Sequence, residues 1–582
     1  MQEENSIISG RGKFLKYKLI NGSDNNYKSP AKTIFENRHV DPKKYANLSS
    51  DCEIPYDELE NIEDAVECLS KHFEDEIHVI VDCDVDGYTS SAILISYLRQ
   101  LAPSINISYH IHSKKQHGFT DDINIPDTAK LIIVPDAGTN DVEACKKYSD
   151  NGTDIIILDH HKVENDNPYA IIVNNQACEY SNKNLSGVGI TYKFLQALDT
   201  EFWLDRSSYF LDLVALGNIA DDMDIREYET KYLIEHGLSA IQNKLFIAYC
   251  EKNSFSIKDS IPTIADCQFY IAPYINAVIR AGSMEEKKLL FKALLEEDEW
   301  FDYKKRGSTE TVKESIYERA VRLSVNTKSR QNKMRDAGQE KAEKFVEKYC
   351  INDKVLFVNV SDIVSEAYTG LTAIRIATKY NRPCLILRRK SDDPDVFGGS
   401  GRNIENGAIP NLNQFLSELN LFTSILGHEN AFGVEIAKAN IPVAIHACNQ
   451  KLKDVEIEKF YECDFIIPYS DFEVAFIHSL YGMRRFWGKG FKEPYVAVSN
   501  VPISTSSIQI IGKQSNTWKY FDENSGIEWI KFSCVDDPIF SVLNDSFANE
   551  KEFVINAVGK VSFNIYKGIA TPQFIIEEYE VV

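Results

Sequence analysis

The chain has 582 residues, which is more than one hydrophobic core usually accommodates, so three or more domains are expected. With 43% hydrophobic and 26% charged residues the composition is globular, and neither a signal-peptide pattern nor a long apolar run is present, so we expect a soluble, cytoplasmic protein without membrane contact. The net charge of −23 requires any site for a polyanion to be locally basic, because Lys and Arg neutralise phosphates.

Alternating strand and helix patterns follow a polar N-terminal arm, residues 1–50. Apolar runs at 78–81, 131–134 and 155–158 precede helix-like or turn segments. Continuous apolar strands separated by helices predict a parallel sheet covered on both faces, and ligands of such sheets bind at the carboxyl ends of the strands. Residues 51–300 are therefore expected to form one α/β domain.

Three further segments are expected towards the C-terminus. Residues 301–350 form a connecting helix with apolar residues at Val312, Ile316, Ala320 and Leu323. Between Tyr303 and Lys348 there are 13 Lys and Arg residues against 7 Asp and Glu, which fits either a nucleic-acid contact or a solvated helix face. A second α/β domain covers residues 351–450, and short strand-like runs predict a β-barrel at 451–582.

Acidic residues and a histidine pair close four apolar segments. Asp82, Asp84 and Asp86 follow the first strand, Asp136 the second and Asp159-His160-His161 the third, and the apolar segment from Leu211 ends at Asp221. We expect each segment, including the fourth, to be a strand whose end meets the others in one crevice. Carboxylates at such close range repel one another unless cations compensate them, and mixed carboxylate and imidazole ligands suit Mn²⁺ or Mg²⁺.

Other interpretations of these residues are weaker. An EF-hand loop starting at Asp82 would need Glu at its twelfth position, where Ile93 stands, and would follow a helix. Asp136 alone fits a turn, and Asp159 to His161 alone fits a helix cap beside a core histidine. Four such motifs, one after another along the chain and each at the end of an apolar segment, favour a functional site over a coincidence. The twelve cysteines, from Cys52 to Cys534, contain no C-x-x-C pair and are expected to be reduced and mostly buried rather than to form disulfides or a structural zinc site.

The four segments resemble the motifs of the DHH phosphoesterases, with Asp159-His160-His161 as the signature, and other segments resemble the RecJ branch. These are Leu185–Phe194, Ile271–Arg280, Gly398–Arg402, Gly427–Gly433, Trp487–Gly490 and Thr571–Glu578. The resemblance implies an α/β fold class: a DHH-type parallel-sheet catalytic domain, a long connecting helix, a smaller α/β DHH-associated substrate-binding domain and a C-terminal OB-like β-barrel.

The resemblance also implies roles for individual residues. Asp84 and Asp136 would hold one Mn²⁺ or Mg²⁺ ion, and Asp86, Asp136, His160 and Asp221 a second, with Asp136 as the bridge. Asp159 and His161 would act in catalysis by orienting ligands or touching the scissile phosphate. Substrate contacts would come from Arg280, Ser400, Arg402 and His428. Trp487 is a candidate for base stacking, although it and its aromatic neighbours fit a core equally well.

One position departs from the family pattern. RecJ proteins commonly carry a histidine four residues before the first metal-binding Asp, and here that position is Ile80. The first ion would then keep only Asp84 and Asp136, with Asp82 at the rim as a helper, since two residues along a strand span roughly 7 Å. We expect the two metal sites to differ in affinity and Ile80→His to lower the Mn²⁺ requirement.

The resulting expectation is a monomeric 5′-to-3′ exonuclease that degrades single-stranded DNA to 5′-mononucleotides in recombination, repair or replication. A single-strand-binding protein or a helicase is the expected protein partner, and cleavage of RNA stays open. One alternative is a phosphodiesterase for short oligonucleotides or cyclic dinucleotides. Enzymes of this kind usually lack the C-terminal barrel, which counts against this alternative. The other is a non-catalytic replication scaffold, which the retained metal ligands disfavour.

Overall fold

The computed structural model describes residues 15–20, 26–120, 123–257, 259–305, 307, 309–361, 364, 368–404, 407–455, 460–512, 515–533 and 552–582. The chain divides into two compact units. One unit comprises Lys44–Ala337 with the short segment Gly488–Phe491, and the other comprises Met1–Lys43, Gly338–Trp487 and Lys492–Val582. The boundary near residue 337 falls within a helix, so this division is coarser than the five segments expected from the sequence.

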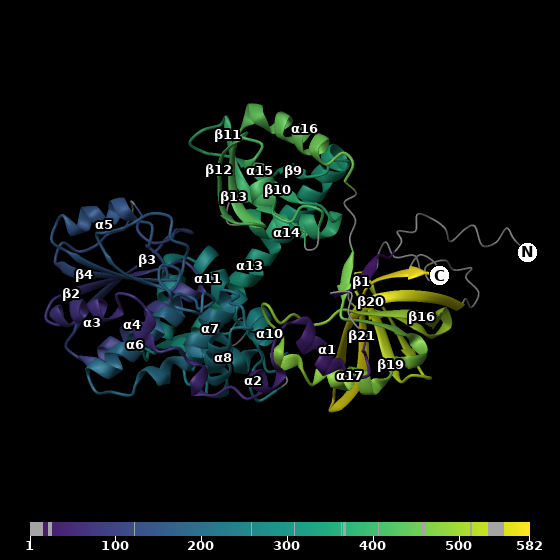
Figure 1. Ribbon diagram of the computed structural model, residues 1–582, viewed down its shortest axis with the longest axis horizontal. Helices are drawn as coiled ribbons and strands as arrows, with labels where there is room; N and C mark the ends of the chain where they lie inside the picture. The colour runs from purple at the N-terminus through teal and green to yellow at the C-terminus, as the bar shows by residue number, and fades with distance from the viewer. Residues whose placement is uncertain are drawn as a thin grey trace, which may run out of the picture. The chain divides into compact units, whose positions relative to one another are not determined.

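A five-stranded parallel sheet with the strand order β3-β2-β4-β5-β6 organises the first unit. Helix α5 lies on one face, and α3, α4 and α6 lie on the other (Figure 1). The apolar strands are buried on both faces, as expected for such a sheet. The bounds are β2 Glu76–Val81, β3 Asn106–Ile111, β4 Ala129–Pro135, β5 Asp154–Asp159, β6 Ile171–Asn174, α3 Ile62–Lys71, α4 Val85–Leu101, α5 Val142–Ser149 and α6 Gly187–Glu201.

The apolar segment that ends at Asp221 is a helix, and our assignment of it as a strand is wrong. Residues Leu211–Ala220 form α7, which packs among α4, α6 and α8. Because neighbours cover it on all sides, the segment is apolar throughout and lacks helical periodicity, so a strand and a buried helix look alike in sequence. The remaining helices of this unit are α8 Tyr228–Ser239, α9 Lys244–Lys252, α10 Ile264–Asp266, the π-helical turn Cys267–Ile271, α11 Ala272–Ala281 and α12 Met284–Leu294.

The expected connecting helix is α13, Ile316–Phe345, but it starts later than the apolar spacing suggested. Val312 lies in β8, Thr311–Ser315, which pairs with β7, Trp300–Lys304. Many cations of the basic island are paired with acids: Lys313 with Asp302, Arg322 with Glu314, Arg330 with Glu286, Arg335 with Asp336 and Lys344 with Glu340. These pairs favour the interpretation as a solvated helix face.

The second α/β part is a five-stranded mixed sheet with the order β12-β13-β11-β10-β9. Helix α14, Thr369–Tyr380, packs on β10 and β11. The other bounds are β9 Leu356–Asn359, β10 Cys384–Arg389, β11 Val396–Arg402, α15 Leu412–Ser417, β12 Phe422–His428, β13 Ala431–Ala437 and α16 Ile441–Lys451. The core of this part is formed by residues such as Phe357, Leu385 and Phe432.

The C-terminal part is an OB-like sheet of seven strands in the order β15-β16-β20-β21-β19-β18-β17. Its strands are β15 Phe465–Pro468, β16 Val496–Ser504, β17 Ile508–Ile511, β18 Thr517–Asp522, β19 Ile527–Lys531, β20 Glu552–Tyr566 and β21 Ile569–Val581, and helix α17 is Val474–Tyr481. Two tryptophans, Trp518 and Trp529, are fully buried in it. The strands confirm the short strand-like runs expected for residues 451–582.

The first part of the N-terminal arm pairs with this C-terminal part, whereas the arm from Lys44 onwards belongs to the unit of the parallel sheet. Strand β1, Tyr17–Leu19, runs parallel to β14, Tyr461–Cys463. After it, α1 (Pro30–Asn37) ends beside Arg38, whose guanidinium makes two bonds of 2.8 and 3.0 Å to the buried carboxylate of Asp464. Residues 1–14 of the expected arm lie outside the described residues.

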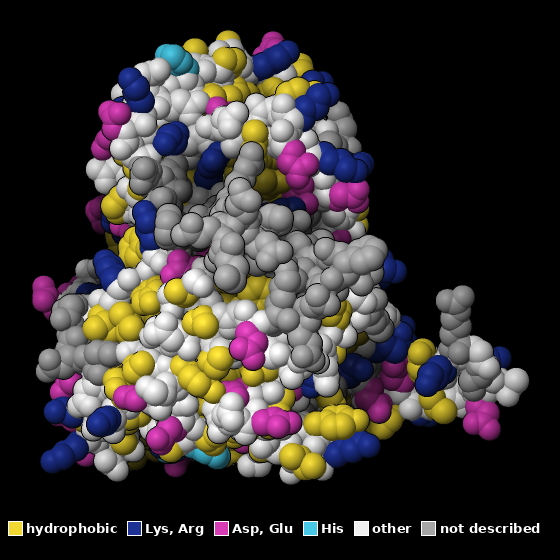
Figure 2. All heavy atoms as spheres, turned by 90° about the vertical axis from the view of Figure 1, so that its right-hand side faces the viewer, with side chains coloured by type: hydrophobic (Ala, Val, Ile, Leu, Met, Phe, Trp, Pro, Cys, Tyr) yellow, Lys and Arg dark blue, Asp and Glu magenta, His cyan; other side chains and the backbone are white. Residues whose placement is uncertain are grey.

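Surface and thiol chemistry agree with the sequence expectations. The cysteines that the structure describes are all free and mostly buried, whereas Cys534 lies outside the described residues. Among the described helices, none has the length and apolar character needed to cross a membrane. On the face drawn in Figure 2, Lys and Arg side chains are interspersed with Asp and Glu, so the excess of negative charge does not gather there.

Candidate metal centre

The turn from β2 into α4 places two of the expected ligands. Asp84 is the N-cap of α4, and its side chain accepts a hydrogen bond from the backbone N–H of Gly87 at 3.0 Å. Asp86 lies in the first turn of the helix and is 1% exposed. Its carboxylate accepts from the backbone N–H groups of Gly187 (2.7 Å) and Val188 (3.0 Å) and from the Ser186 hydroxyl (3.0 Å). The start of α6 therefore holds Asp86 in place, which explains the RecJ-like segment that begins at Leu185.

Asp136 follows β4 in a left-handed backbone conformation, with φ of 68°. Its N–H donates to the Leu158 carbonyl at 2.8 Å, so the turn is tied to β5. The start of α6 passes so close that a Cβ on Gly187 would lie 2.4 Å from Asp136 Oδ1. Only glycine leaves room at that position, and the close approach buries the Asp136 carboxylate to 1% exposure.

Asp159, the last residue of β5, orients the histidine pair. Its Oδ1 accepts from the backbone N–H groups of His160 and His161 and, at 2.8 Å, from His161 Nδ1, and its Oδ2 accepts from the Thr139 hydroxyl at 2.7 Å. Burial by itself would raise the pKa of Asp159, but the hydrogen bonds and the charges of the two histidines hold that pKa well below its usual range. Asp159 therefore stays ionised and acts on its neighbours rather than on a proton.

His160 Nε2 faces three carboxylate oxygens without a hydrogen bond to any of them. The distances are 3.3 Å to Asp136 Oδ1, 3.5 Å to Asp221 Oδ2 and 3.9 Å to Asp86 Oδ2. Both His160 Nε2 and Asp136 Oδ1 are buried and lack a partner. Burial lowers the pKa of His160, which favours the neutral ring with a free lone pair. Such a lone pair among carboxylate oxygens fits a cation.

A second group of oxygens lies on the other side of Asp136. One carboxylate oxygen each of Asp82, Asp84 and Asp136 lie within 4.8 Å of one another. Asp82 is 1% exposed, so its expected place at the rim is wrong. It also lies beyond the end of β2, where strand spacing no longer applies, and it accepts from Gly118 N–H at 3.0 Å and contacts His117 Nδ1 at 2.7 Å.

Ile80, at the position of the missing histidine, is fully buried in an apolar cluster with residues such as Ile132 and Val134. Among the described residues, the possible ligands grouped with Asp84 are Asp82 and Asp136, and Ile80 adds no ring nitrogen to them.

Burial and mutual repulsion raise the pKa of Asp136 and Asp221. Burial, together with the charges of Asp86, Asp84 and their neighbours, raises the pKa of Asp136 well above its usual range. The same two causes raise the pKa of Asp221 to about 8. Hard oxygen ligands with one imidazole are the set that Mn²⁺ and Mg²⁺ accept, so the residues fit two divalent ions that share Asp136.

The expected substrate contacts of the second α/β part meet on one sheet. Ser400 and Arg402 lie on β11, and Arg402 and His428 both pair with Ala431 of the strand between them. The Ser400 hydroxyl is 2.8 Å from that of Thr369, the first residue of α14. A Cβ on Gly370 would lie 2.8 Å from the Arg402 guanidinium, so glycine lets this side chain lie against the helix start.

Two other expected contacts have different outcomes. Arg280 is exposed near the end of α11 in the unit that contains the metal centre. Trp487 is 8% exposed, and Phe486 and Phe491 are buried as well. A buried ring offers no face to a base. The interpretation of these aromatic residues as core residues therefore holds, and the expectation that Trp487 stacks on bases is wrong.

Residues that the sequence interpretation missed also belong to the centre. His117 and Thr139 are isolated polar residues in loops, and no sequence spacing connects them to the acids with which they form hydrogen bonds.

Exposed aromatic residues occur on the π-helical turn Cys267–Ile271, where Phe269 is 71% and Tyr270 38% exposed. Their neighbour Gln268 donates to Asp222 at 3.2 Å, next to Asp221. π-Helical turns are frequent at functional sites.

Comparisons with known proteins agree with this geometry. Residues 76–218 match the DHH family, N-terminal domain, and residues 463–578 match the RecJ OB domain. A SPbeta prophage-derived protein of Bacillus subtilis, named as a single-strand DNA-specific exonuclease, is 39% identical over 575 residues, which are 98% of each chain. The RecJ exonuclease of Haemophilus influenzae is 23% identical, with 79% of this chain and 81% of that protein covered.

Among solved structures, RecJ of Thermus thermophilus in complex with Mn²⁺ has a TM-score of 0.70 at 17% identity, covering 95% of this chain and 76% of that one. Exonuclease RecJ bound to manganese has a TM-score of 0.53 at 19% identity, covering 70% of this chain and 97% of that one. Both matches show that this chain has the same fold as these two structures.

Proposed function

Since this chain belongs to the RecJ family of DHH phosphoesterases, we propose that it is a metal-dependent exonuclease specific for single-stranded DNA. The observation that carries the proposal is the pair of buried, unpartnered atoms His160 Nε2 and Asp136 Oδ1, 3.3 Å apart and surrounded by further carboxylates. A buried polar atom without a partner is costly, and a divalent cation between these two removes that cost.

Two ligand sets share Asp136. Asp86, Asp136, His160 and Asp221 would hold one ion, and Asp82, Asp84 and Asp136 the other, with Mn²⁺ or Mg²⁺ as the metal. When bound, such ions activate a water molecule and offset the charge that builds on the phosphoryl oxygens during in-line displacement. The start of α6 keeps Asp86 aimed at the centre, so the ligands are positioned before the substrate arrives.

His161 supplies a positive charge at the metal centre from a protein side chain. Although burial disfavours the charged ring, its hydrogen bond to Asp159 and the surrounding carboxylates raise its pKa to about 9. Its side chain is 53% exposed, so it can reach a ligand. We assign it to the scissile phosphate, where an imidazolium held by Asp159 donates a charge-assisted hydrogen bond.

Arg402, Ser400 and His428 would bind a phosphate group of the substrate. An arginine beside a helix start and a hydroxyl pair forms the kind of anion site that recognises a terminal phosphate. Cleavage from the 5′ end with release of 5′-mononucleotides is proposed from the RecJ resemblance. Arg280, on the exposed side of α11, would contact the backbone of the same strand.

Phe269 and Tyr270 replace Trp487 as the candidates for base stacking. Both rings are exposed, and Gln268 connects their turn to the residue after Asp221. Aromatic stacking accepts any unpaired base and excludes paired ones, which suits a nuclease for single strands. Roles in DNA recombination, repair or replication, and cooperation with a single-strand-binding protein or a helicase, are part of the same proposal.

The experiment uses 5′-end-labelled single-stranded DNA, blunt duplex DNA and RNA, each incubated with Mn²⁺, with Mg²⁺ or with chelator. We expect mononucleotides from single-stranded DNA in the presence of metal and a rate that falls steeply with salt. Equal degradation of blunt duplex would contradict the assignment, and release of dinucleotides or cleavage of only short oligomers would favour the oligonucleotide phosphodiesterase.

Arg402→Ala tests the phosphate site and Arg389→Ala is its matched control. Arg389 is an exposed arginine at the opposite end of the same sheet, because it pairs with Phe397 while Arg402 pairs with Cys384. Arg402→Ala should raise KM roughly 10-fold or more, the value of a hydrogen bond to a charged group, and leave metal binding unchanged. Equal effects of the two variants would remove the phosphate site.

A further inference from the structure

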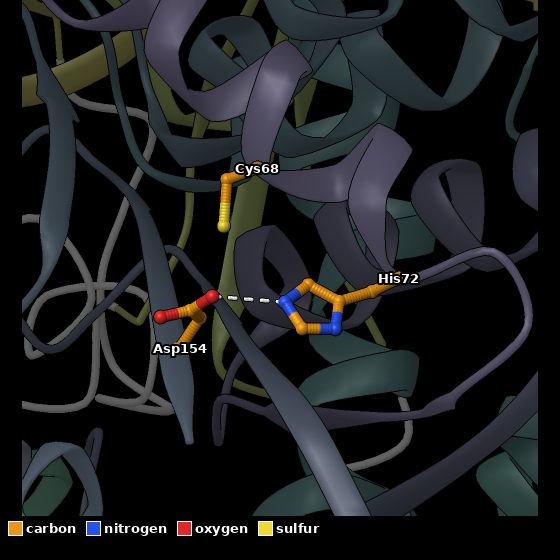
Figure 3. Close-up of side chains that lie close together, drawn as sticks. All are labelled: Cys68, His72 and Asp154. Carbon is orange, nitrogen blue, oxygen red and sulfur yellow. Dashed lines mark hydrogen bonds and ion pairs between the residues drawn. The ribbon is translucent and has the colours of Figure 1, made fainter. Parts of the chain in front are cut away.

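A second group of metal-ligating side chains lies at the edge of the parallel sheet opposite to the catalytic edge. Cys68 on α3, His72 at the C-cap of that helix and Asp154, the first residue of β5, each offer one ligand atom, and these atoms lie within 4.8 Å of one another. Figure 3 shows the three side chains pointing toward one another. Because the catalytic Asp159 ends the same strand, the two groups are separated by roughly 17 Å along β5.

The chemistry of this group differs from that of the catalytic centre. It combines a thiol, an imidazole and one carboxylate, which is the set that Zn²⁺ prefers over Mn²⁺ or Mg²⁺. Cys68 and His72 are four residues apart, and that spacing places both side chains on one face of the α3 helix end. Among the described residues, it is the one potential metal-binding group with a cysteine away from the catalytic edge.

A second acid fixes the orientation of the imidazole. His72 Nδ1 lies 2.9 Å from Asp75 Oδ2, and His72 Nε2 lies 2.9 Å from Asp154 Oδ2. The contact of His72 Nε2 with Asp154 is a hydrogen bond or ion pair, and a metal that replaced this contact would bind Nε2 while Nδ1 donates to Asp75. This is the arrangement found around zinc, where a carboxylate holds the far nitrogen of a ligating histidine.

We propose that Cys68, His72 and Asp154 bind one Zn²⁺ ion that joins α3 to β5, with Asp75 as the orienting acid. Binding replaces the thiol proton by the metal: Cys68–SH and Zn²⁺ yield the zinc thiolate and one H⁺. Burial beside Asp154 raises the pKa of Cys68 to about 11, so the thiol keeps its proton until a metal displaces it. The proposal goes beyond nuclease activity, since the ion would tie together the edge of the sheet that is remote from catalysis.

The site is partly open. Cys68 is 5% exposed, whereas the side chain of Asp154 is 61% exposed, so the fourth position of a tetrahedral ion would be occupied by water. The exposed Asp154 side chain can rotate to bring its oxygen to the short ligand separations that zinc requires.

Cobalt is the probe that separates this site from the catalytic one. The full-length protein is first saturated with Mn²⁺, then titrated with Co²⁺, and the thiolate-to-cobalt charge-transfer band in the near ultraviolet is recorded. We expect a band that saturates at one Co²⁺ per chain and that Zn²⁺ abolishes by competition. The absence of this band would overturn the proposal and leave His72 as a side chain held between Asp75 and Asp154 by hydrogen bonds.

Four variants identify the ligands. Cys68→Ser should abolish the band, and Asp154→Asn, an exposed substitution that does not endanger folding, should weaken Co²⁺ binding at least roughly 10-fold. Asp75→Asn should weaken it roughly 10- to 100-fold, the usual effect of an orienting partner. Cys83→Ser is the control, because Cys83 lies with Asp82 and His117 near the catalytic centre. A band that survives Cys68→Ser but disappears in Cys83→Ser would contradict the proposal.

Discussion

The two edges of the parallel sheet carry similar residues in different environments. Strand β5 begins with Asp154 and ends with Asp159, and each of these acids contacts a histidine. At the carboxyl edge Asp82, Asp86, Asp136 and Asp159 are buried, and Asp136 Oδ1 has no hydrogen-bond partner. At the amino edge Asp154 is exposed and ion-paired with His72.

Burial, rather than the number of acids, decides which edge needs cations. In the interior, Coulomb repulsion between carboxylates is several times stronger than at the surface, since water no longer screens it. The pKa of Asp221 accordingly rises to about 8 at the carboxyl edge. At an exposed acid such as Asp154, water screens the charge of the carboxylate. The carboxyl edge therefore depends on metal for its function, and the amino edge does not.

Asp136→Ala should have the largest effect on nuclease activity, because it removes the ligand shared by both ions. Each ion contributes several kcal/mol to the reaction, so we expect a loss on the order of 10³-fold or more. The measurement is the release of mononucleotides from single-stranded DNA, with thermal unfolding to verify the fold. Asp150→Ala, an exposed acid beyond α5, is the control. Appreciable turnover by Asp136→Ala, or by the wild type in excess chelator, would refute the two-metal mechanism.

Asp159→Asn should reduce activity roughly 10- to 100-fold, as expected when a group that orients metal ligands is altered. The amide cannot accept all the hydrogen bonds that His160, His161 and Thr139 donate to the carboxylate. Calorimetry should still detect two ions. Thr139→Val, which removes one of these donors, should have a smaller effect, and a loss of one ion in Asp159→Asn would instead make Asp159 a ligand.

Asp82→Asn should raise the Mn²⁺ concentration for half-maximal rate roughly 10-fold, with a smaller change in the rate at saturation. The reason is that Asp82 completes the ligand set of Asp84 and Asp136 that has no histidine. Steady-state rates over a range of Mn²⁺ measure this effect. The companion variant is Ile80→His: if it lowers the Mn²⁺ requirement while Asp82→Asn leaves it unchanged, the site is incomplete without a histidine.

Asp154→Asn should have the smallest effect of these variants on nuclease activity, and it therefore tests whether the amino edge of the sheet is independent of catalysis. Without added zinc it removes one exposed ion pair, which contributes less than about 1 kcal/mol to the free energy of unfolding. The rate on single-stranded DNA should stay within about 2-fold of the wild type. A large loss of activity would mean that the two edges are coupled through β5.

Much of the catalytic edge could be predicted from the sequence because its residues follow buried strands. The apolar runs before Asp84, Asp136 and Asp159 are β2, β4 and β5, and the carboxyl ends of parallel strands meet at one edge whatever the loops do. The fourth segment was placed correctly at the centre but assigned the wrong secondary structure, since a helix buried on all sides has no polar face to reveal its period.

The parallel sheet, the family and the candidate metal ligands follow from the sequence alone, since strand patterns and short motifs are local properties of the chain. Only the tertiary structure decided that Asp82 joins Asp84, that Trp487 is buried and that Cys68 meets Asp154 from 86 residues away. Each of these depends on which surfaces pack together. Burial and contact between distant segments arise from the whole fold, and no spacing within one segment encodes them.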